Sequence, residues 1–533
     1  PNTTFSDIFL PARDGSEVYH FDATGRHLRT LHPLTGAALW TFGYDATRQL
    51  VSLTDGDGNA TTLARNTAGQ LTAIRSPDGH TTAITLDAQG YLSTITDPLG
   101  ARISLTHTSE GLLTRLVDPR GGTHTYAYDA QGLLVSDTNA LGATKRLLRL
   151  SGSSGYTVVV TDALGLAVRR GVNTDAFGME QRRAADSDSL SQRAATYTGG
   201  DGSVRHVTRD GQQSVTETAP DPQWGAGVPV TTRERLFDPT GQVYMTSLVT
   251  RTAVLSDPRN PFSLATLTQT VTLNAKTSVT VYTAATRQWR HTDAAGVVTL
   301  TTIDALGRPV RMETVGGSVQ TLRYDSRGRL VEQTTSAGTT SRSMQYTYSP
   351  AGWLATVTDP LSGTTRWAHD AVGRVLTTTL ATGHQERYRY DVAGNLVMAQ
   401  DPTGLVTEYG YDAQGQHVST LVDPAGTATL TTYQYDAVGN AVAVVADAGP
   451  GRANRTARTT WERGQGDHYR LASVVDAAGV PTRYQYDSQD RLIAATDALS
   501  QTTQLRYDPQ GRLAEQVAPN GAISRWALSL IHI

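Results

Sequence analysis

The sequence predicts an all-β protein built on a repeat of 21 residues. Two kinds of turn alternate along the chain, and stretches of five to seven residues rich in Leu, Val, Thr and Tyr separate them. Within a stretch such as 112–117, apolar and polar residues alternate, which is the period of a β-strand. No stretch shows a convincing helical period with capping residues. Each unit is therefore expected to read strand, turn, strand, turn.

The first turn follows a tyrosine and continues as Asp-x-x-Gly and then Arg, Asn or Leu. Its Asp slot recurs every 21 residues at positions 45, 66, 87, 108 and 129, and again between 304 and 325 and through 370, 391 and 412. We predict that the residues of this signature have a structural role. They are Tyr128, Asp129, Gly132, Tyr324, Asp325, Gly328, Arg329, Tyr390, Asp391, Gly394, Tyr411, Asp412, Gly415, Tyr435, Asp436, Gly439, Tyr507, Asp508 and Gly511.

The second turn lies about ten residues later and is typified by Asp97-Pro-Leu-Gly and Asp118-Pro-Arg-Gly. Asp or Asn first, Pro second and Gly fourth is the chemistry of a type I turn, because the Asx side chain binds the backbone ahead and Pro presets φ. Glycine then takes the position after the turn. Gly328, Gly394 and Gly511 of the first turn are likewise expected at positive φ or in tight turns.

The number of units constrains the architecture. Roughly 18 units of two strands would make more than about 30 strands, a sheet on the order of 150 Å wide. Twisted open sheets seldom exceed about ten strands without curling. The sequence therefore predicts a curled antiparallel meander that winds into a tube or shell.

The regularity of the repeat divides the chain into four parts. Residues 1–150 and 291–528 keep the register, whereas residues 151–290 keep less of it and contain Pro-rich joints at Asp221-Pro222 and Asp257-Pro258. We interpret 151–290 as diverged repeats with longer loops or as a strand-rich insert, and a separate globular domain is the less favoured alternative. The next Asp slot falls at 529, which is Ser, so residues 529–533 are expected to be a non-native tail of a truncated chain.

Composition excludes several classes of function. The net charge of −3 gives no electrostatic reason to bind nucleic acid or an anionic membrane. The absence of cysteine excludes disulfides, thiolate metal sites and a cysteine nucleophile. The apolar runs are too short to span a bilayer.

Candidate chemistry is weak throughout. Asp55-Gly-Asp57-Gly-Asn59 spaces oxygens like the start of a calcium loop, but Ala60 and Asn66 stand where an EF-hand needs Gly and Glu. We interpret it as a turn. The 13 histidines have no metal-ligand spacing, and no serine-nucleophile elbow or phosphate loop is present. We expect no catalytic residue, no metal and no cofactor, and hence no enzyme.

Tyr-x-Tyr pairs occur in many units and place two rings on one face of a strand. Repetition would stack these rings into aromatic ladders. We favour cross-strand packing as their role, and a sticky wall that holds an unfolded cargo or a glycan is the alternative. The pairs are 126/128, 388/390, 409/411, 433/435 and 484/486.

The repeat resembles that of the YD-repeat family, which includes bacterial Rhs proteins, the shell-forming B and C components of insecticidal toxin complexes, and animal teneurins. The residues that carry the resemblance are Tyr324-Asp325-Ser-Arg-Gly328-Arg329-Leu330 and its copies beginning at Tyr390 and Tyr507, and the match covers roughly 20–150 and 290–528. The resemblance implies a hollow β-shell that encloses a polypeptide. It identifies the chain as part of a secreted or surface scaffold of an Rhs-type polymorphic toxin used in interbacterial competition or against hosts, with a C-terminal toxin domain as cargo. Secretion machinery and cell-surface glycans are further partners, and a cell-surface adhesion or carbohydrate-binding module is the alternative.

Members of that family cut the cargo free with an aspartyl self-cleavage segment. The nearest string is Asp401-Pro402-Thr403-Gly404-Leu405, which lies in register with the ordinary turns, and Leu396 stands where the family motif has a proline. We interpret the string as a turn.

Overall fold

The structure is a computed structural model that describes residues 7–174, 180–185, 194–199, 202–208, 211–449, 452–464, 468–509 and 511–526. The proposed tail at 529–533 lies outside the described residues. The described part contains 46 β-strands, one short 3-10 turn and no α-helix, so the all-β prediction is confirmed. Within this part, no helix is long and apolar enough to cross a membrane.

Contacts divide the chain into two units, which we describe separately. Unit 1 comprises residues 1–100, 216–234 and 245–385, and unit 2 comprises residues 101–215, 235–244 and 386–533. Four strands contribute residues to both units: β20 (Gln213–Asp221), β21 (Gly225–Phe237), β22 (Val243–Leu255) and β34 (Gln385–Tyr390).

The other elements of unit 1 are β1 (Ile8–Pro11), β2 (Val18–Phe21), β3 (His27–Leu31), β4 (Ala38–Tyr44), β5 (Leu50–Asp55), β6 (Ala60–Arg65), β7 (Leu71–Arg75), β8 (Thr81–Leu86), β9 (Leu92–Thr96), η1 (Pro261–Ser263), β23 (Leu264–Leu273), β24 (Lys276–Thr283), β25 (Gln288–Thr292), β26 (Val298–Ile303), β27 (Pro309–Thr314), β28 (Val319–Tyr324), β29 (Leu330–Ala337), β30 (Thr340–Tyr348), β31 (Leu354–Thr358), β32 (Thr364–His369) and β33 (Val375–Thr379).

The other elements of unit 2 are β10 (Arg102–His107), β11 (Leu113–Val117), β12 (Thr123–Tyr128), β13 (Leu134–Thr138), β14 (Thr144–Ser151), β15 (Gly155–Thr161), β16 (Ala167–Thr174), β17 (Glu180–Ala185), β18 (Ala194–Thr198), β19 (Val204–Val207), β35 (Leu396–Gln400), β36 (Val406–Tyr411), β37 (His417–Val422), β38 (Thr429–Tyr435), β39 (Ala441–Ala446), β40 (Arg455–Arg463), β41 (Tyr469–Val475), β42 (Pro481–Tyr486), β43 (Leu492–Thr496), β44 (Thr502–Tyr507), β45 (Leu513–Val517) and β46 (Ile523–Arg525).

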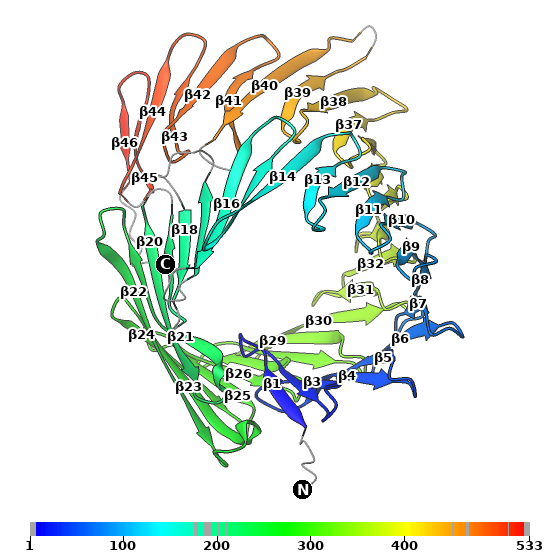
Figure 1. Cartoon of the computed structure of the whole chain (residues 1–533), viewed down its shortest axis with the longest axis vertical. Helices are drawn as coiled ribbons and strands as arrows, with labels where there is room; N and C mark the ends of the chain where they lie inside the picture. Colours follow the sequence, from blue (N-terminus) through cyan, green and yellow to red (C-terminus); the bar gives the residue numbers. More distant parts are fainter. Residues whose placement is uncertain are drawn as a thin grey trace. The chain divides into compact units, whose positions relative to one another are not determined.

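The strands form the antiparallel meander that the repeat predicts. In unit 1, β28 pairs with β29 and β29 pairs with β30, and in unit 2 β44 pairs with β45 in the same way. The ribbon in Figure 1 shows this order as a gradual change of colour from strand to strand. The register shifts by one residue at the signature tyrosine, so that Tyr324 lies opposite Leu330 and Tyr507 opposite Leu513. Each signature turn thus begins with a β-bulge.

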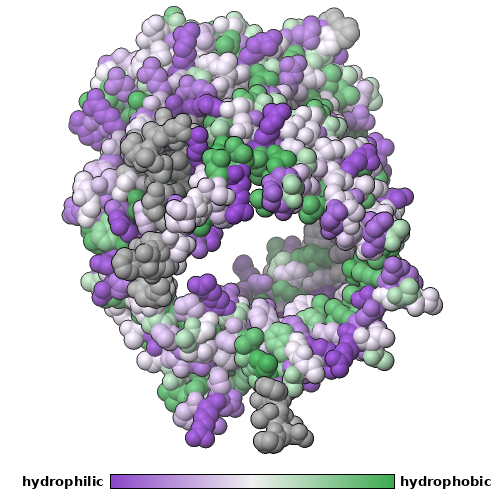
Figure 2. All heavy atoms as spheres, viewed as in Figure 1, coloured by the Kyte–Doolittle hydropathy of each residue, from purple (hydrophilic) through white to green (hydrophobic). Residues whose placement is uncertain are grey.

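The two faces of a strand differ in exposure. In β44, Gln504 and Arg506 are exposed, whereas Leu505 and Tyr507 on the opposite face are half-buried. Thirteen hydrophobic residues among those described are buried. Polar and apolar residues are correspondingly mixed over the face seen in Figure 2. Stability must therefore come largely from contacts between neighbouring strands, as expected for a thin repeat array.

Unit 1 also contains a small conventional core. Leu264 and Leu267 of β23 pack with Tyr282 of β24 and Ile303 of β26, and Trp289 lies against this cluster. The ring centroids of Tyr282 and Trp289 are 4.9 Å apart. This core anchors strands β23 to β26 to one another.

A buried polar junction ties the N-terminal strands of unit 1 to this core. The amide of Gln223 donates hydrogen bonds of 3.0 Å to the carbonyls of Pro33 and Pro261, which lie in separate segments. Asp221, 2% exposed, accepts the backbone N–H of Gln223 and faces Arg251 at 3.1 Å. Because buried polar groups need partners, this junction fixes the approach of three segments.

Candidate functional site

The signature turn is held by its aspartate. Asp325 Oδ1 accepts the backbone N–H groups of Arg327 and Arg329 at 2.9 and 3.0 Å, and Gly328 donates its N–H to the Asp325 carbonyl at 3.0 Å. Gly328 has a φ of 76°, which a side chain disfavours. This is a type I turn followed by a left-handed residue, the usual three-to-five-residue hairpin connection.

The second carboxylate oxygen of the same aspartate explains the arginine of the signature. Asp325 Oδ2 accepts hydrogen bonds from Arg329 Nε at 2.9 Å and Nη2 at 2.8 Å. Burial alone would raise the pKa of Asp325, but these bonds and the backbone bonds outweigh it and lower the pKa. In turns that have Asn instead of Arg, the amide binds the aspartate, as Asn395 does with Asp391 at 2.9 Å. The Asp325 carboxylate is therefore ionised at neutral pH, and both of its oxygens accept hydrogen bonds.

The signature tyrosine joins one 21-residue repeat to the repeat before it. Tyr348 donates its hydroxyl to the carbonyl of Leu330 at 2.8 Å, and the Arg329 guanidinium lies 4.5 Å from its ring centroid. Burial raises the pKa of Tyr348, although the positive charge of Arg329 opposes the rise. The hydroxyl thus satisfies a carbonyl beside the bulge of the preceding turn. A signature turn is completed only by the tyrosine of the next repeat.

The other predicted signature residues are placed in the same way. Hydroxyl-to-carbonyl bonds of 2.7 to 2.9 Å join Tyr128 to Leu113, Tyr324 to Pro309, Tyr411 to Leu396, Tyr435 to His417 and Tyr507 to Leu492. Side chains that accept backbone N–H bonds within their own turns include Asp129, Asp391, Asp412, Asp436 and Asp508. Positive φ values are found at Gly132 (76°), Gly394 (95°), Gly415 (85°), Gly439 (94°) and Gly511 (78°). Tyr390 lies at the bulge opposite Leu396.

The Tyr-x-Tyr pairs contribute rings to cross-strand clusters. In unit 2, His417 lies between three tyrosines, with ring centroids 5.7 Å from Tyr409, 5.6 Å from Tyr411 and 4.8 Å from Tyr433. All four side chains are half-buried. In this cluster the tyrosine rings therefore pack across neighbouring strands, which is the role that the sequence favoured.

In unit 1, turns far apart in the sequence meet in a row that we call the unit 1 seam. Asp57, in the turn after β5, accepts two hydrogen bonds from Arg308 Nη1 at 2.9 and 2.7 Å. Asp78, in the turn after β7, pairs with Arg327. Further contacts join Thr35 to Ala305, Asn59 to Arg327, and His80 to Ala351 and Trp353.

Unit 2 has an equivalent row, the unit 2 seam. Gln414 Oε1, in a signature turn, accepts the backbone N–H of Ala140 at 3.1 Å. Tyr469 donates its hydroxyl to Asp162 Oδ2 at 2.9 Å, and burial together with this bond raises the pKa of Tyr469 to about 12. Arg120 faces Asp391 at 3.9 Å. Within each unit, second turns of the earlier segment therefore contact signature turns of the later one.

The seams were not predicted from the sequence. Asp57, which we weighed as a calcium ligand, is engaged with Arg308, so the turn interpretation is the one that the structure supports. Asp401 likewise holds a turn, with Oδ1 accepting the N–H groups of Thr403 and Leu405 at 2.8 and 3.0 Å. Among the described residues, no group of three or more His, Cys, Asp or Glu side chains could hold a metal ion.

Comparison with known proteins supports the same architecture. The family model for the teneurin YD-shell matches residues 7–407, and the RHS repeat model matches 390–428, 467–502 and 487–523. No curated protein matches the chain.

Several solved structures are similar, all at low identity. They include TcdB2-TccC3 without its hypervariable C-terminal region (15% identity, 94% of this chain and 30% of that chain covered, TM-score 0.39). A Tc holotoxin pore of Photorhabdus luminescens matches at 14% identity over 96% of this chain and 29% of that chain, with a TM-score of 0.36. A TcdB2-TccC3-Cdc42 structure matches at 15% identity over 96% and 29%, with a TM-score of 0.34. The chain spans about a third or less of the length of these proteins.

Proposed function

Because the chain belongs to the teneurin YD-shell family, we propose that it forms part of the wall of an encapsulating β-shell. The family match over residues 7–407 is the observation that carries this proposal. The side-chain chemistry agrees with it, because the signature Tyr, Asp and Arg groups are occupied in joining one repeat to the next. A scaffold needs such saturated contacts, whereas a catalytic site needs reactive groups that remain available.

We further propose that the shell holds a polypeptide cargo, a toxin domain encoded after the repeats in a longer Rhs-type protein. Two features support a wall that can enclose a polypeptide. The seams within each unit join turns of an early segment to turns of a late one, and they thereby close gaps between successive passes of the meander. Half-buried aromatic rings such as those around His417 offer apolar contact to an unfolded chain. Such a toxin would act outside the producing cell, so the protein would be secreted or displayed at the surface of a bacterium.

Limited proteolysis of the full-length protein that contains this chain tests enclosure. Peptides released over time would be identified by mass spectrometry, with the segment after the repeats expressed alone as the control. Enclosure predicts that this segment survives inside the full-length protein until the repeats themselves are cut, although the isolated segment is digested at once. Digestion of the segment at the same rate in both proteins, with the repeats intact, would overturn the proposal.

A further inference from the structure

A histidine begins one of the second turns, at the position that other repeats give to aspartate or asparagine. His32 lies between β3 and β4, where its backbone N–H donates to the carbonyl of Ala37 at 2.8 Å and its carbonyl accepts the N–H of Gly36 at 2.9 Å. Asp97 and Asn139 hold the same position in other second turns. In this turn an imidazole ring therefore stands where a carboxylate or an amide usually orders the backbone.

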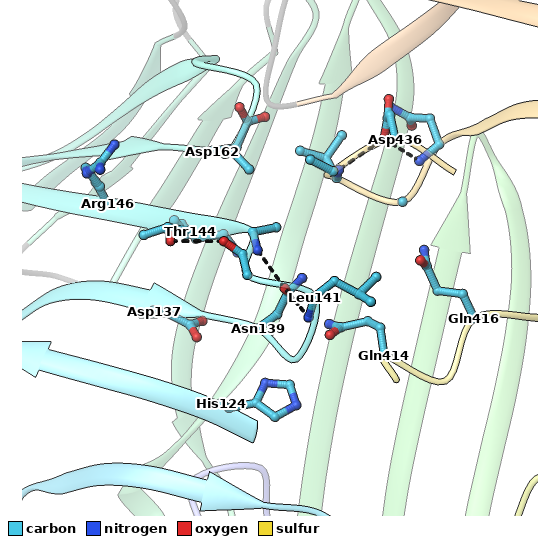
Figure 3. Close-up of a pocket in the computed structure, with 18 of the residues that line it drawn as sticks. His124, Asp137, Asn139, Leu141, Thr144, Arg146, Asp162, Gln414, Gln416 and Asp436 are labelled. Carbon is cyan, nitrogen blue, oxygen red and sulfur yellow. Dashed lines mark hydrogen bonds between the residues drawn. The ribbon is translucent and has the colours of Figure 1, made fainter. Parts of the chain in front are cut away.

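Asn139 shows how a neutral side chain orders such a turn. Its Oδ1 accepts the backbone N–H groups of Leu141 and Ala143 at 3.1 and 2.9 Å. Figure 3 shows Asn139 and Leu141 in this turn, at the wall of the pocket that they line, with hydrogen bonds dashed. An amide oxygen does not titrate, so this turn keeps its acceptor in acid.

In His32 the acceptor is a nitrogen that can take up a proton. Nδ1 accepts the backbone N–H groups of Leu34 and Thr35 at 3.4 and 3.3 Å. Because both of these groups are donors, the proton of the neutral ring is assigned to Nε2. Both nitrogens of a charged imidazole are donors, so protonation removes the acceptor that this turn uses.

The same turn lies in the unit 1 seam. Thr35 donates its hydroxyl to the carbonyl of Ala305 at 2.5 Å, and a Cβ atom on Gly307 would collide with Nε2 of His32. Ala305 and Gly307 belong to the turn 304–308 between β26 and β27. The turn 32–36 therefore contacts the other side of the seam through Thr35 and through the imidazole ring.

The carboxylate that faces His32 across the seam is already engaged with a cation. Asp304 Oδ2 accepts a hydrogen bond from Arg308 Nε at 2.7 Å, and Arg308 also pairs with Asp57 at 2.7 Å. A proton on His32 would therefore compete with Arg308 for the same negative charge.

Burial lowers the pKa of His32, although the negative charge of Asp304 opposes this effect. On the other side of the turn, Asp221 and Arg251 pair with each other in the polar junction that holds Pro33. The ring is therefore neutral at neutral pH. Because the folded pKa lies below the usual value of 6.5, the contribution of His32 to stability is present above 6.5 and is lost as the pH falls through the folded value.

We propose that His32 makes the unit 1 seam sensitive to mild acid. Protonated Nδ1 can donate to Thr35 Oγ1 at 3.2 Å, but the two backbone N–H groups lose their acceptor. One hydrogen bond then replaces two, the turn 32–36 loosens, and Thr35 is no longer held beside Ala305. In a wall that encloses a cargo, mild acid would loosen unit 1 at this turn, a consequence that rests on the proposed function, whereas the sensitivity of the seam does not.

Hydrogen exchange of the intact chain at pH 7.5 and pH 5.0, followed by mass spectrometry, tests the sensitivity itself. After correction for the intrinsic effect of pH, peptides covering 32–37 and 304–308 should open about fivefold more readily at pH 5.0, the loss of about one hydrogen bond. Peptides covering 139–143, a turn ordered by Asn139, should open equally at both pH values.

Two variants separate His32 from the other histidines. His32→Asn supplies the acceptor that Asn139 uses and should abolish the fivefold response. His80→Asn is the matched control in the same seam, because His80 Nε2 lies 3.0 Å from the carbonyl of Ala351, and a bond donated to a carbonyl survives protonation of the ring. This variant should keep the wild-type response.

Equal opening of the wild-type 32–37 peptide at both pH values would overturn the inference, and so would a fivefold response that persists in His32→Asn. A second measurement uses only the wild-type protein, so that it does not require the variant to fold. Exchange of the imidazole C2 proton, also followed by mass spectrometry, gives the pKa of His32 directly. A midpoint below 6.5 is expected, and a midpoint at or above 6.5 would overturn the inference.

Discussion

The Gly328→Ala substitution should damage a turn and the unit 1 seam together. Gly328 has a φ of 76°, and a Cβ atom there would meet the Asp57 carboxylate and the Arg308 guanidinium, which form a seam ion pair. Gly404 is a matched control, because its φ is 94° and a Cβ atom would meet nothing within 4 Å. Both substitutions force alanine into the left-handed region, but only the first also displaces the ion pair.

The two costs can be separated in magnitude. A left-handed alanine costs about 1–2 kcal/mol, which both variants share. Disturbing the charge-assisted hydrogen bonds between Arg308 and Asp57 adds about 1.5–3 kcal/mol in Gly328→Ala. Since about 1.4 kcal/mol is a factor of ten, local opening should become about tenfold easier in Gly404→Ala and at least about a hundredfold easier in Gly328→Ala.

Hydrogen exchange followed by mass spectrometry measures these openings in the intact chain. In Gly328→Ala, exchange should accelerate in peptides that cover 325–329 and also in those that cover 55–59, about 270 residues away across the seam. In Gly404→Ala, acceleration should be confined to the strands flanking 401–405. If residues 55–59 exchange at the wild-type rate in Gly328→Ala while 325–329 opens, the seam contact does not stabilise the turn and the reasoning fails.

Three further outcomes are expected. Tyr324→Phe removes the hydroxyl that binds the Pro309 carbonyl and should cost about 1 kcal/mol in urea unfolding, while a Phe variant of similar cost at Tyr19 would refute a specific role for that bond. Arg308→Met and Asp57→Asn should give a coupling energy of about 1–3 kcal/mol in a double-mutant cycle, and additive effects would contradict a direct interaction. Acid should destabilise the fold: the pKa values of Asp325, Asp370 and Asp487 are lowered, so their contribution is present above the unfolded value near 3.8 and is lost as pH falls through the folded values. A melting temperature unchanged between pH 6 and pH 3 would contradict this.

The turns could be predicted because their chemistry is local. The side chain of Asp325 binds N–H groups two and four residues ahead, and the left-handed glycine lies three residues ahead, so one short window contains the whole turn. The all-β class follows from the same window repeated every 21 residues. The link between neighbouring repeats is also close in sequence and could have been predicted. Tyr348 binds a carbonyl 18 residues earlier, and Tyr324 binds one 15 residues earlier.

The contacts of the two seams could not be predicted from the sequence. Asp57 and Arg308 are 251 residues apart, and a repeat with a 21-residue period does not encode which earlier turn a later turn will meet. Asp57 therefore looked like a free carboxylate in an acidic turn. Alternation of Arg and Asn after the signature glycine was the one available signal of side-chain roles at the turns.

The seam constrains how a protein of this kind can change its length. In an open solenoid a repeat can be gained or lost anywhere, because each unit touches only its neighbours. In unit 1, a 21-residue insertion between β8 and β26 leaves every seam residue with the same partner. It only lengthens the chain segment that connects the two sides of the seam. An insertion of one repeat between Asp57 and Asp78 instead moves the later turns of this segment along the seam by one signature turn, so that Asp78 no longer faces Arg327. Within the stretches of turns that the seam joins, the gain of one repeat therefore requires a compensating insertion on the other side of the seam, and variation in repeat number within these stretches should occur in such pairs among relatives.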